Sequence, residues 1–242
     1  MVALSKPTLI QELFVNTLTT QIPVIDLSKA DSKQLIVKAC EDFGFFKVVN
    51  HGIPLKLIDK LESEAAKFFD SPESVKAQAG PPDPFGYGNK NIGRNGDVGW
   101  LEYLLLDVKR HSTHPQNLNF QCVVDDYVRA VKKMACEILE MMADELKIEA
   151  RNVFSKLLMD EESDSVFRVN YYPPCPEVKE NDGNGNLIGF GEHTDPQIIS
   201  VLRSDNTSGL QISLKDASWL SVPPDSQSFF INVGDSLQTQ AF

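Results

Sequence analysis

The pattern of apolar and polar positions predicts a helical first part of the chain. Residues 31–44 and 54–72 each place apolar side chains three and four positions apart, which is the spacing of one helix face. Residues 45–49 (FFKVV) between them read as a short buried strand. The longest predicted helix covers about 122–146, and its apolar stripe predicts a face packed on the core.

The pattern changes from about Ser165 onward. Residues 80–99 are dense in Gly, Pro and Asn and predict a loop, but the last part of the chain consists of short apolar runs separated by turn residues. Many short strands with turn signals at this density are typical of a sandwich or a jelly-roll barrel. We therefore expect an α+β fold in which a helical N-terminal half packs on a β barrel. The predicted strands are 165–172, 187–194, 198–203, 210–213, 219–222 and 228–233.

Composition limits the classes of partner. The 242 residues carry 23 Lys and Arg against 34 Asp and Glu, a formal net charge of −11. Nucleic acid and anionic membranes require concentrated positive charge, so we expect neither as a partner. Four scattered cysteines without a C-x-x-C pair suit a reducing compartment. Without a signal peptide or an apolar run of spanning length, we expect a cytoplasmic protein.

His193 and Asp195 are the candidate metal ligands. In an extended segment, residues two apart project to the same side, so the imidazole and the carboxylate can hold one ion together. One carboxylate and two His form the iron site of non-haem Fe(II) oxygenases. H-x-D alone is a weak signal, because a strand-end His paired with a nearby Asp gives the same three letters.

Asn170 and Tyr172, in the run NYYPPCP, are the candidate ligand-binding residues. Both fall on one face of a predicted strand, and an amide and a phenol directed at one point can bind an anion. The alternative is a strand that ends in a Pro-stiffened turn, with Tyr172 in the core. The H-x-D motif about twenty residues later favours the binding hypothesis.

These motifs belong to a longer pattern that resembles the plant 2-oxoglutarate- and Fe(II)-dependent dioxygenases. Within them the chain is most similar to the gibberellin 2-oxidases that act on C19 gibberellins. The blocks GWLEYLLL and GEHTDPQIISVLRS are similar to that branch in particular, and the others are shared widely in the superfamily. The matching blocks are IPVIDLS, EDFGFFKVVNHGIP, GYGNKNIGRNGDVGWLEYLLL, VFRVNYYPPCP and GFGEHTDPQIISVLRSDNTSGLQI.

The resemblance implies a double-stranded β-helix fold and a reaction. His193 and Asp195 match two of three iron ligands, and Asn170 and Tyr172 match residues that hold 2-oxoglutarate. The implied reaction is 2β-hydroxylation of a gibberellin by O2, coupled to decarboxylation of 2-oxoglutarate, with ascorbate as supporting reductant. The implied divisions are an N-terminal dioxygenase region (20–120), backbone helices (121–160) and the jelly-roll domain (161–242).

The family pattern also implies two groups that this sequence lacks. The second iron-binding His and the Arg that clamps 2-oxoglutarate are expected beyond Phe242, so we expect a C-terminally truncated, incomplete jelly roll with little or no activity. His51, His111 and His114 are the other histidines, and all precede the barrel. We expect none of them to replace the missing ligand.

Several alternatives remain open at this stage. The substrate can be another gibberellin or a flavonoid, or the product can be non-catalytic and bind a ligand or an intact homologue. We expect a monomer. Gibberellins carry a carboxylate, so the pocket needs a local cation, which the sequence does not identify. Arg168 and Arg203 flank the expected site, although Arg168 has its own place in the strand 165–172.

Overall fold

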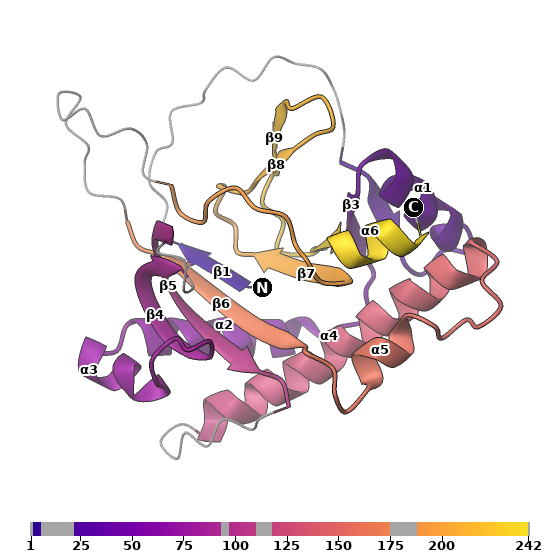
Figure 1. Cartoon of the computed structure of the whole chain (residues 1–242). Helices are drawn as coiled ribbons and strands as arrows, with labels where there is room; N and C mark the ends of the chain where they lie inside the picture. The colour runs from indigo at the N-terminus through magenta and orange to yellow at the C-terminus, as the bar shows by residue number, and fades with distance from the viewer. Residues whose placement is uncertain (1, 6–21, 93–96, 110–117, 175–187, 242) are drawn as a thin grey trace.

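The computed structural model describes residues 2–5, 22–92, 97–109, 118–174 and 188–241. Among these residues, eight strands form one curved sheet with the order β2-β3-β10-β7-β1-β6-β5-β4 (Figure 1). The two remaining strands form a separate hairpin, β8–β9. The strands are β1 (Val2–Ser5), β2 (Val24–Asp26), β3 (Phe45–Val49), β4 (Gly86–Ile92), β5 (Asp97–Asp107), β6 (Val166–Tyr172), β7 (Ile199–Ser204), β8 (Gln211–Ser213), β9 (Trp219–Ser221) and β10 (Phe229–Val233).

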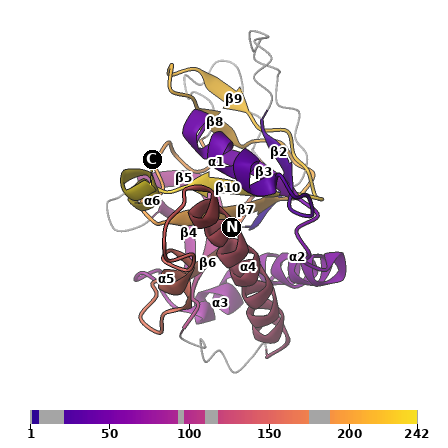
Figure 2. The same ribbon diagram turned by 90° about the vertical axis from the view of Figure 1, so that its right-hand side faces the viewer.

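The helices include the three that the apolar spacing predicted. Those three are α1, α2 and α4 below, and α4 contacts both of the others. Figure 2 shows α1 beside β2 and β3, with α2 and α4 on the lower side of the molecule. The helices are α1 (Ser32–Asp42), α2 (Leu55–Phe69), α3 (Glu73–Lys76), α4 (Leu118–Glu145), α5 (Ser155–Met159) and α6 (Asp235–Ala241), with a 3-10 turn at Ala77–Ala79.

Alternation along the strands gives the sheet two chemically different faces. On β6, Phe167 and Val169 are buried on the helix side, where Phe167 meets the ring of Tyr127 from α4. On β10, Phe229 and Ile231 are fully buried in the same core. The residues between them in the sequence point to the opposite face, because successive strand side chains alternate. We call the first face the core face and the second the site face.

A second, smaller core lies on the site face at the far end of the sheet. Phe45 of β3, Phe230 of β10 and Val222 after β9 are buried together, with partly buried residues of the β8–β9 hairpin packed around them. Lys47 is buried beside them and donates to the carbonyl of Pro223 at 2.9 Å. The hairpin therefore covers this end of the sheet.

The structure corrects two of the strand and loop predictions. Much of 80–99 is not a loop, because β4 and the start of β5 pair antiparallel there. Gly88 fits this pairing since a Cβ at that position would overlap the ring of Tyr103. The predicted strand 187–194 is wrong over its described residues, which are irregular backbone. The segment 173–186, which its Pro, Gly and Asn content predicts as a surface connection, lies outside the described residues except for its first two positions.

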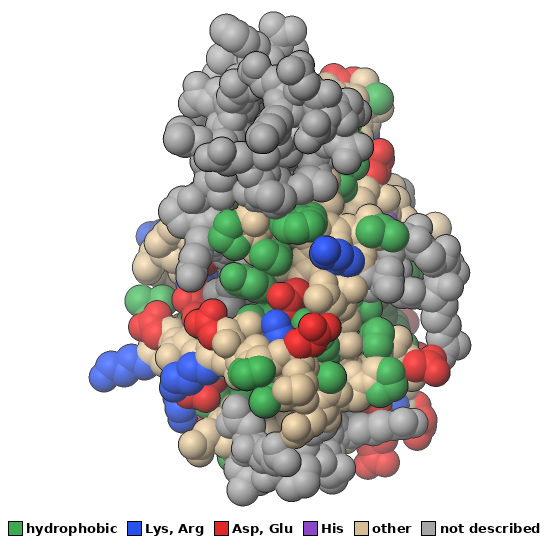
Figure 3. All heavy atoms as spheres, turned by 90° about the vertical axis from the view of Figure 1, so that its left-hand side faces the viewer, with side chains coloured by type: hydrophobic (Ala, Val, Ile, Leu, Met, Phe, Trp, Pro, Cys, Tyr) green, Lys and Arg blue, Asp and Glu red, His purple; other side chains and the backbone are tan. Residues whose placement is uncertain are grey.

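The surface and the helices add two further observations. On the face shown in Figure 3, Lys and Arg side chains are intermixed with Asp and Glu side chains. Across the described part of the chain, no helix combines the length and the apolar character that crossing a bilayer requires.

Candidate metal centre and cosubstrate site

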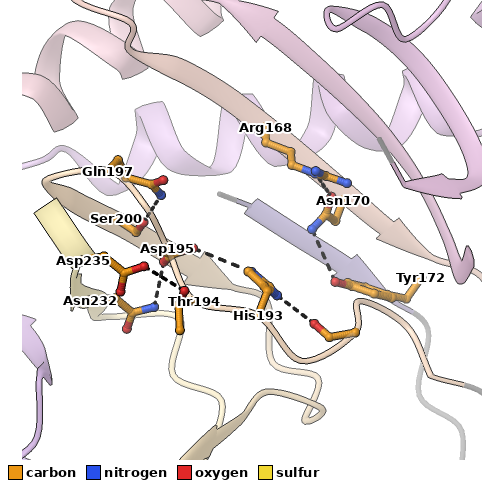
Figure 4. Close-up of polar contacts among 11 residues, drawn as sticks. Arg168, Asn170, Tyr172, His193, Thr194, Asp195, Gln197, Ser200, Asn232 and Asp235 are labelled. Carbon is orange, nitrogen blue, oxygen red and sulfur yellow. Dashed lines mark hydrogen bonds and ion pairs between the residues drawn. The ribbon is translucent and has the colours of Figure 1, made fainter. Parts of the chain in front are cut away.

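His193 and Asp195 lie together on the loop that precedes β7. The imidazole Nε2 is 3.7 Å from Asp195 Oδ1 (Figure 4). Two ligand atoms that each bind one metal ion at about 2.0–2.2 Å are at most about 4.4 Å apart, so this pair can share an ion. The side chain of His193 is 43% exposed and that of Asp195 is 19% exposed. An ion between them is therefore accessible from solvent.

The hydrogen bond on the other imidazole nitrogen favours metal binding. His193 Nδ1 lies 2.7 Å from the carbonyl oxygen of Gly191. A carbonyl only accepts, so Nδ1 carries a proton, and Nε2 is the ring nitrogen that can offer a lone pair to a metal ion beside Asp195. Such a bond to the second nitrogen fixes the tautomer and the orientation of a ligating His.

The start of α6 holds this loop in place. The Asp235 N–H donates to the carbonyl of Asp195 at 2.8 Å, and Thr194 Oγ1 donates to the Asp235 carboxylate at 2.8 Å. Gly234 packs so closely here that a Cβ would overlap the carbonyl oxygen of Gln197. From β10, Asn232 Nδ2 donates to Asp195 Oδ2 at 3.4 Å. The metal loop is therefore positioned by residues about forty places later in the chain.

Strand β6 contributes a connected row of polar side chains to the site face. Asn170 is fully buried, and its Oδ1 accepts a hydrogen bond from Arg168 Nε at 2.8 Å. Its Nδ2 donates to the hydroxyl of Tyr172 at 3.3 Å. Burial raises the pKa of Tyr172, so the phenol stays protonated and can donate to an anion. Gly189, on the loop that also carries His193, packs so closely on the Tyr172 ring that a Cβ there would overlap it.

Among the described residues, no group of three His, Cys, Asp or Glu side chains is placed to hold a metal ion. His51, one alternative that the sequence offers, accepts the N–H of Ile53 through Nδ1 and packs edge-on against Phe229. His111 and His114 lie outside the described residues. Within the described residues, the candidate metal centre therefore offers two ligands, His193 and Asp195.

Two known family models match most of this chain. The family model for the non-haem dioxygenase in morphine synthesis N-terminal region matches residues 22–123, and the model for the 2OG-Fe(II) oxygenase superfamily matches 163–240. Gibberellin 2-beta-dioxygenase 1 of Pisum sativum is 62% identical over 98% of this chain and 75% of its own length. The gibberellin 2-beta-dioxygenase of Phaseolus coccineus is 59% identical with the same coverage.

The chain belongs to the gibberellin 2-beta-dioxygenase family. The expected plant 2-oxoglutarate- and Fe(II)-dependent dioxygenase assignment is therefore confirmed, and with it the α+β fold. Among solved structures, JOX2 in complex with 2OG, Fe and JA has a TM-score of 0.75 at 29% identity, over 90% of this chain and 65% of that one. Fe(II) and 2-oxoglutarate are the cofactors of this family.

The dioxygenase contains two site features that sequence reasoning missed. One is the role of α6, which was not predicted as a helix. The other is a cation–π contact of the Arg168 guanidinium with two rings, those of Tyr103 and Phe190, at 4.1 and 4.6 Å from their centroids. Alternation along β6 could have placed Arg168 on the same face as Asn170. The contact with Phe190 could not be predicted, because that ring comes from irregular backbone.

Proposed function

We propose that this dioxygenase fold serves 2β-hydroxylation of C19 gibberellins. The observation that carries the proposal is the His193–Asp195 pair, 3.7 Å apart, in a chain 62% identical to a gibberellin 2-beta-dioxygenase. Bound Fe(II) would activate O2, so that one oxygen atom hydroxylates the substrate and the other oxidises 2-oxoglutarate to succinate and CO2. The protein contributes the positions of the three partners.

The site residues divide into ligands and positioning residues. His193 Nε2 and Asp195 Oδ1 hold the iron, and the Tyr172 hydroxyl donates to 2-oxoglutarate. Asn170 is bonded at both ends of its amide, to Arg168 and to Tyr172, so it aligns those two side chains. We therefore propose that Asn170 positions these side chains, whereas the motif implies that it contacts 2-oxoglutarate directly.

We further propose that the 242 residues alone turn over little gibberellin. Two protein ligands hold a metal ion less tightly than three, and the described residues offer no third. Ascorbate as reductant, a monomeric state and a cytoplasmic location remain predictions from the sequence.

The test is product formation by the purified chain, with Fe(II), 2-oxoglutarate and ascorbate. A matched chain, extended at Phe242 with the C-terminal segment of the Pisum sativum relative, is assayed beside it. We expect 2β-hydroxygibberellin and equal succinate from the extended chain and little from the printed one. An extended chain that consumes 2-oxoglutarate yet leaves every C19 gibberellin unchanged would overturn the substrate assignment.

A second substrate class has some structural support. The dioxygenase for auxin oxidation 1 from Arabidopsis thaliana, solved with 2-oxoglutarate, shares the fold with a TM-score of 0.73 at 25% identity over 90% of this chain and 81% of that one. A panel of acidic plant hormones and flavonoids, offered to the extended chain, separates this alternative from gibberellin.

A further inference from the structure

Arg168 carries a buried donor that no described residue satisfies. Its Nη2 is shielded from solvent and has no hydrogen-bond partner in the part of the chain that the structure describes. Among the described residues, no carboxylate lies within salt-bridge range of this guanidinium. Burial lowers the pKa of Arg168, but a guanidinium stays charged at any physiological pH. A buried, charged N–H that lacks an acceptor is costly, and a ligand that supplies one recovers that cost.

The other contacts of Arg168 fix the direction of this donor. Nε donates to Asn170 Oδ1 at 2.8 Å, and the rings of Tyr103 and Phe190 cover the guanidinium at 4.1 and 4.6 Å. With Nε bonded and both rings over the group, its orientation is set before any ligand arrives. Preorganised donors lose little entropy on binding.

Arg203, which is buried, is an arginine with a structural role and serves as a comparison for Arg168. Arg203 of β7 forms an ion pair with Glu62 of α2 and donates to the carbonyl of Ser226 at 3.0 Å. No described residue bonds its Nε either, but the ion pair neutralises its charge within the protein. Arg168 is less buried as a residue, but its Nη2 atom is equally shielded from solvent and no such ion pair neutralises its charge within the described residues.

The position of Arg168 defines the ligand. Phe190, which covers its guanidinium, packs edge-on against His193 with ring centroids 4.3 Å apart. A group bound at Arg168 therefore lies close to the metal ligands, on the same strand face as Tyr172 (Figure 4). A guanidinium with in-plane donors matches the planar, charged carboxylate.

We propose that Arg168 receives the carboxylate of an organic acid bound beside the metal centre. This inference rests on the proposed function, which brings two such acids to the site: the gibberellin and 2-oxoglutarate. It names the local cation that a carboxylate substrate requires. Arg168 touches the bound acid, and Asn170 is its positioning residue.

The test measures equilibrium binding to the full 242-residue chain loaded with Mn2+, by titration calorimetry. The probes are 2-oxoglutarate, a C19 gibberellin and the methyl ester of that gibberellin, which has the same shape without the charge. The variants are Arg168→Met and, as a control for net charge, Arg129→Met on the exposed face of α4. Arg168→Gln repeats the measurement should Arg168→Met fail to fold.

We expect Arg168→Met to lower the binding affinity for one of the two acids by about 10- to 100-fold, which corresponds to the loss of a charge-assisted hydrogen bond. Loss for the gibberellin but not its ester identifies the substrate as the source of the carboxylate. Loss for 2-oxoglutarate alone identifies the cosubstrate. Arg129→Met should change neither acid by more than about twofold, as surface charges contribute little.

Four results overturn the assignment: unchanged binding of both acids, equal losses for the gibberellin and its ester, equal losses in Arg129→Met, or a wild-type chain that binds neither acid. Failure here is separable from failure of the proposed function. If the extended chain turns over gibberellin and Arg168→Met binds both acids as the wild type does, the proposed function is supported and the role of Arg168 is wrong. If Arg168→Met loses 2-oxoglutarate binding and the extended chain does not turn over gibberellin, the role of Arg168 is supported and the proposed substrate is wrong.

Discussion

The core face and the site face of strands β6 and β10 carry different kinds of side chain, although both faces belong to the same two strands. On the core face, Phe167, Val169 and Ile231 are buried against helices and make no polar contact. On the site face of the same strands, Arg168 and Asn170 are bonded in a row beside the metal loop. Neighbouring residues on one strand thus serve the core and the candidate site in turn. Substitutions on the core face should lower the free energy of unfolding, and those on the site face should lower ligand affinity.

The largest effect is expected on the core face of β10. Ile231→Ala removes a fully buried side chain and should lower the free energy of unfolding by about 2–5 kcal/mol. Its neighbour Asn232 points to the site face, where it makes one long bond to Asp195. Asn232→Ala should cost under about 1.5 kcal/mol. Urea unfolding of both variants checks this, and equal losses would contradict the division between faces.

The next effect is expected at the loop that carries the metal ligands. Gly234→Ala forces a Cβ into the carbonyl of Gln197 and should displace His193 and Asp195. We expect Mn2+ affinity to fall about 10- to 100-fold, as for other losses of ligand support. Gly191→Ala is the matched control because its Cβ would meet nothing within 4 Å. A Gly234→Ala protein with wild-type metal affinity would show that α6 does not position the loop.

A smaller effect is expected at the cosubstrate end. A Cβ at Gly189 would lie 2.6 Å from the ring of Tyr172. Gly189→Ala should therefore tilt that ring and weaken 2-oxoglutarate binding about tenfold, the value of one hydrogen bond. Mn2+ binding should stay unchanged, since His193 and Asp195 are untouched. Calorimetry with each ligand separates the two, and a parallel loss of Mn2+ would place Tyr172 in the metal support instead.

The smallest effect concerns pH and the core face. Burial lowers the pKa of His51, whose ring packs on Phe229. In the unfolded chain this His takes up a proton near pH 6.5, before the folded protein does. Stability should therefore fall as the pH drops through that value, and His51→Asn should remove part of the fall. Urea unfolding between pH 7.5 and 5.5 measures both slopes, and identical slopes would exclude His51 as a contributor.

Sequence patterns predicted the elements whose signal is local. The helices α1, α2 and α4 and the strands β3, β6, β7 and β10 follow from apolar spacing. Gly- and Asn-rich β4 shows no such spacing, because its pairing with β5 depends on the partner strand. The irregular segment before β7 depends on residues outside it, because Arg168 contacts the Phe190 ring and the start of α6 bonds to Thr194 and Asp195. The candidate residues form two pairs in the structure, His193 with Asp195 and Asn170 with Tyr172, whereas their partners from α6 and β10 could not be predicted from local sequence patterns.

The most direct measurement is where a paramagnetic ion binds. Mn2+ added to the isotope-labelled 242-residue chain broadens the amide signals of residues near it. We predict broadening of the loop 191–197, of Tyr172 and of Asn232, with the acidic run at 160–162 unaffected. Broadening confined to that acidic run, or spread evenly over the surface, would contradict a metal centre built on His193 and Asp195.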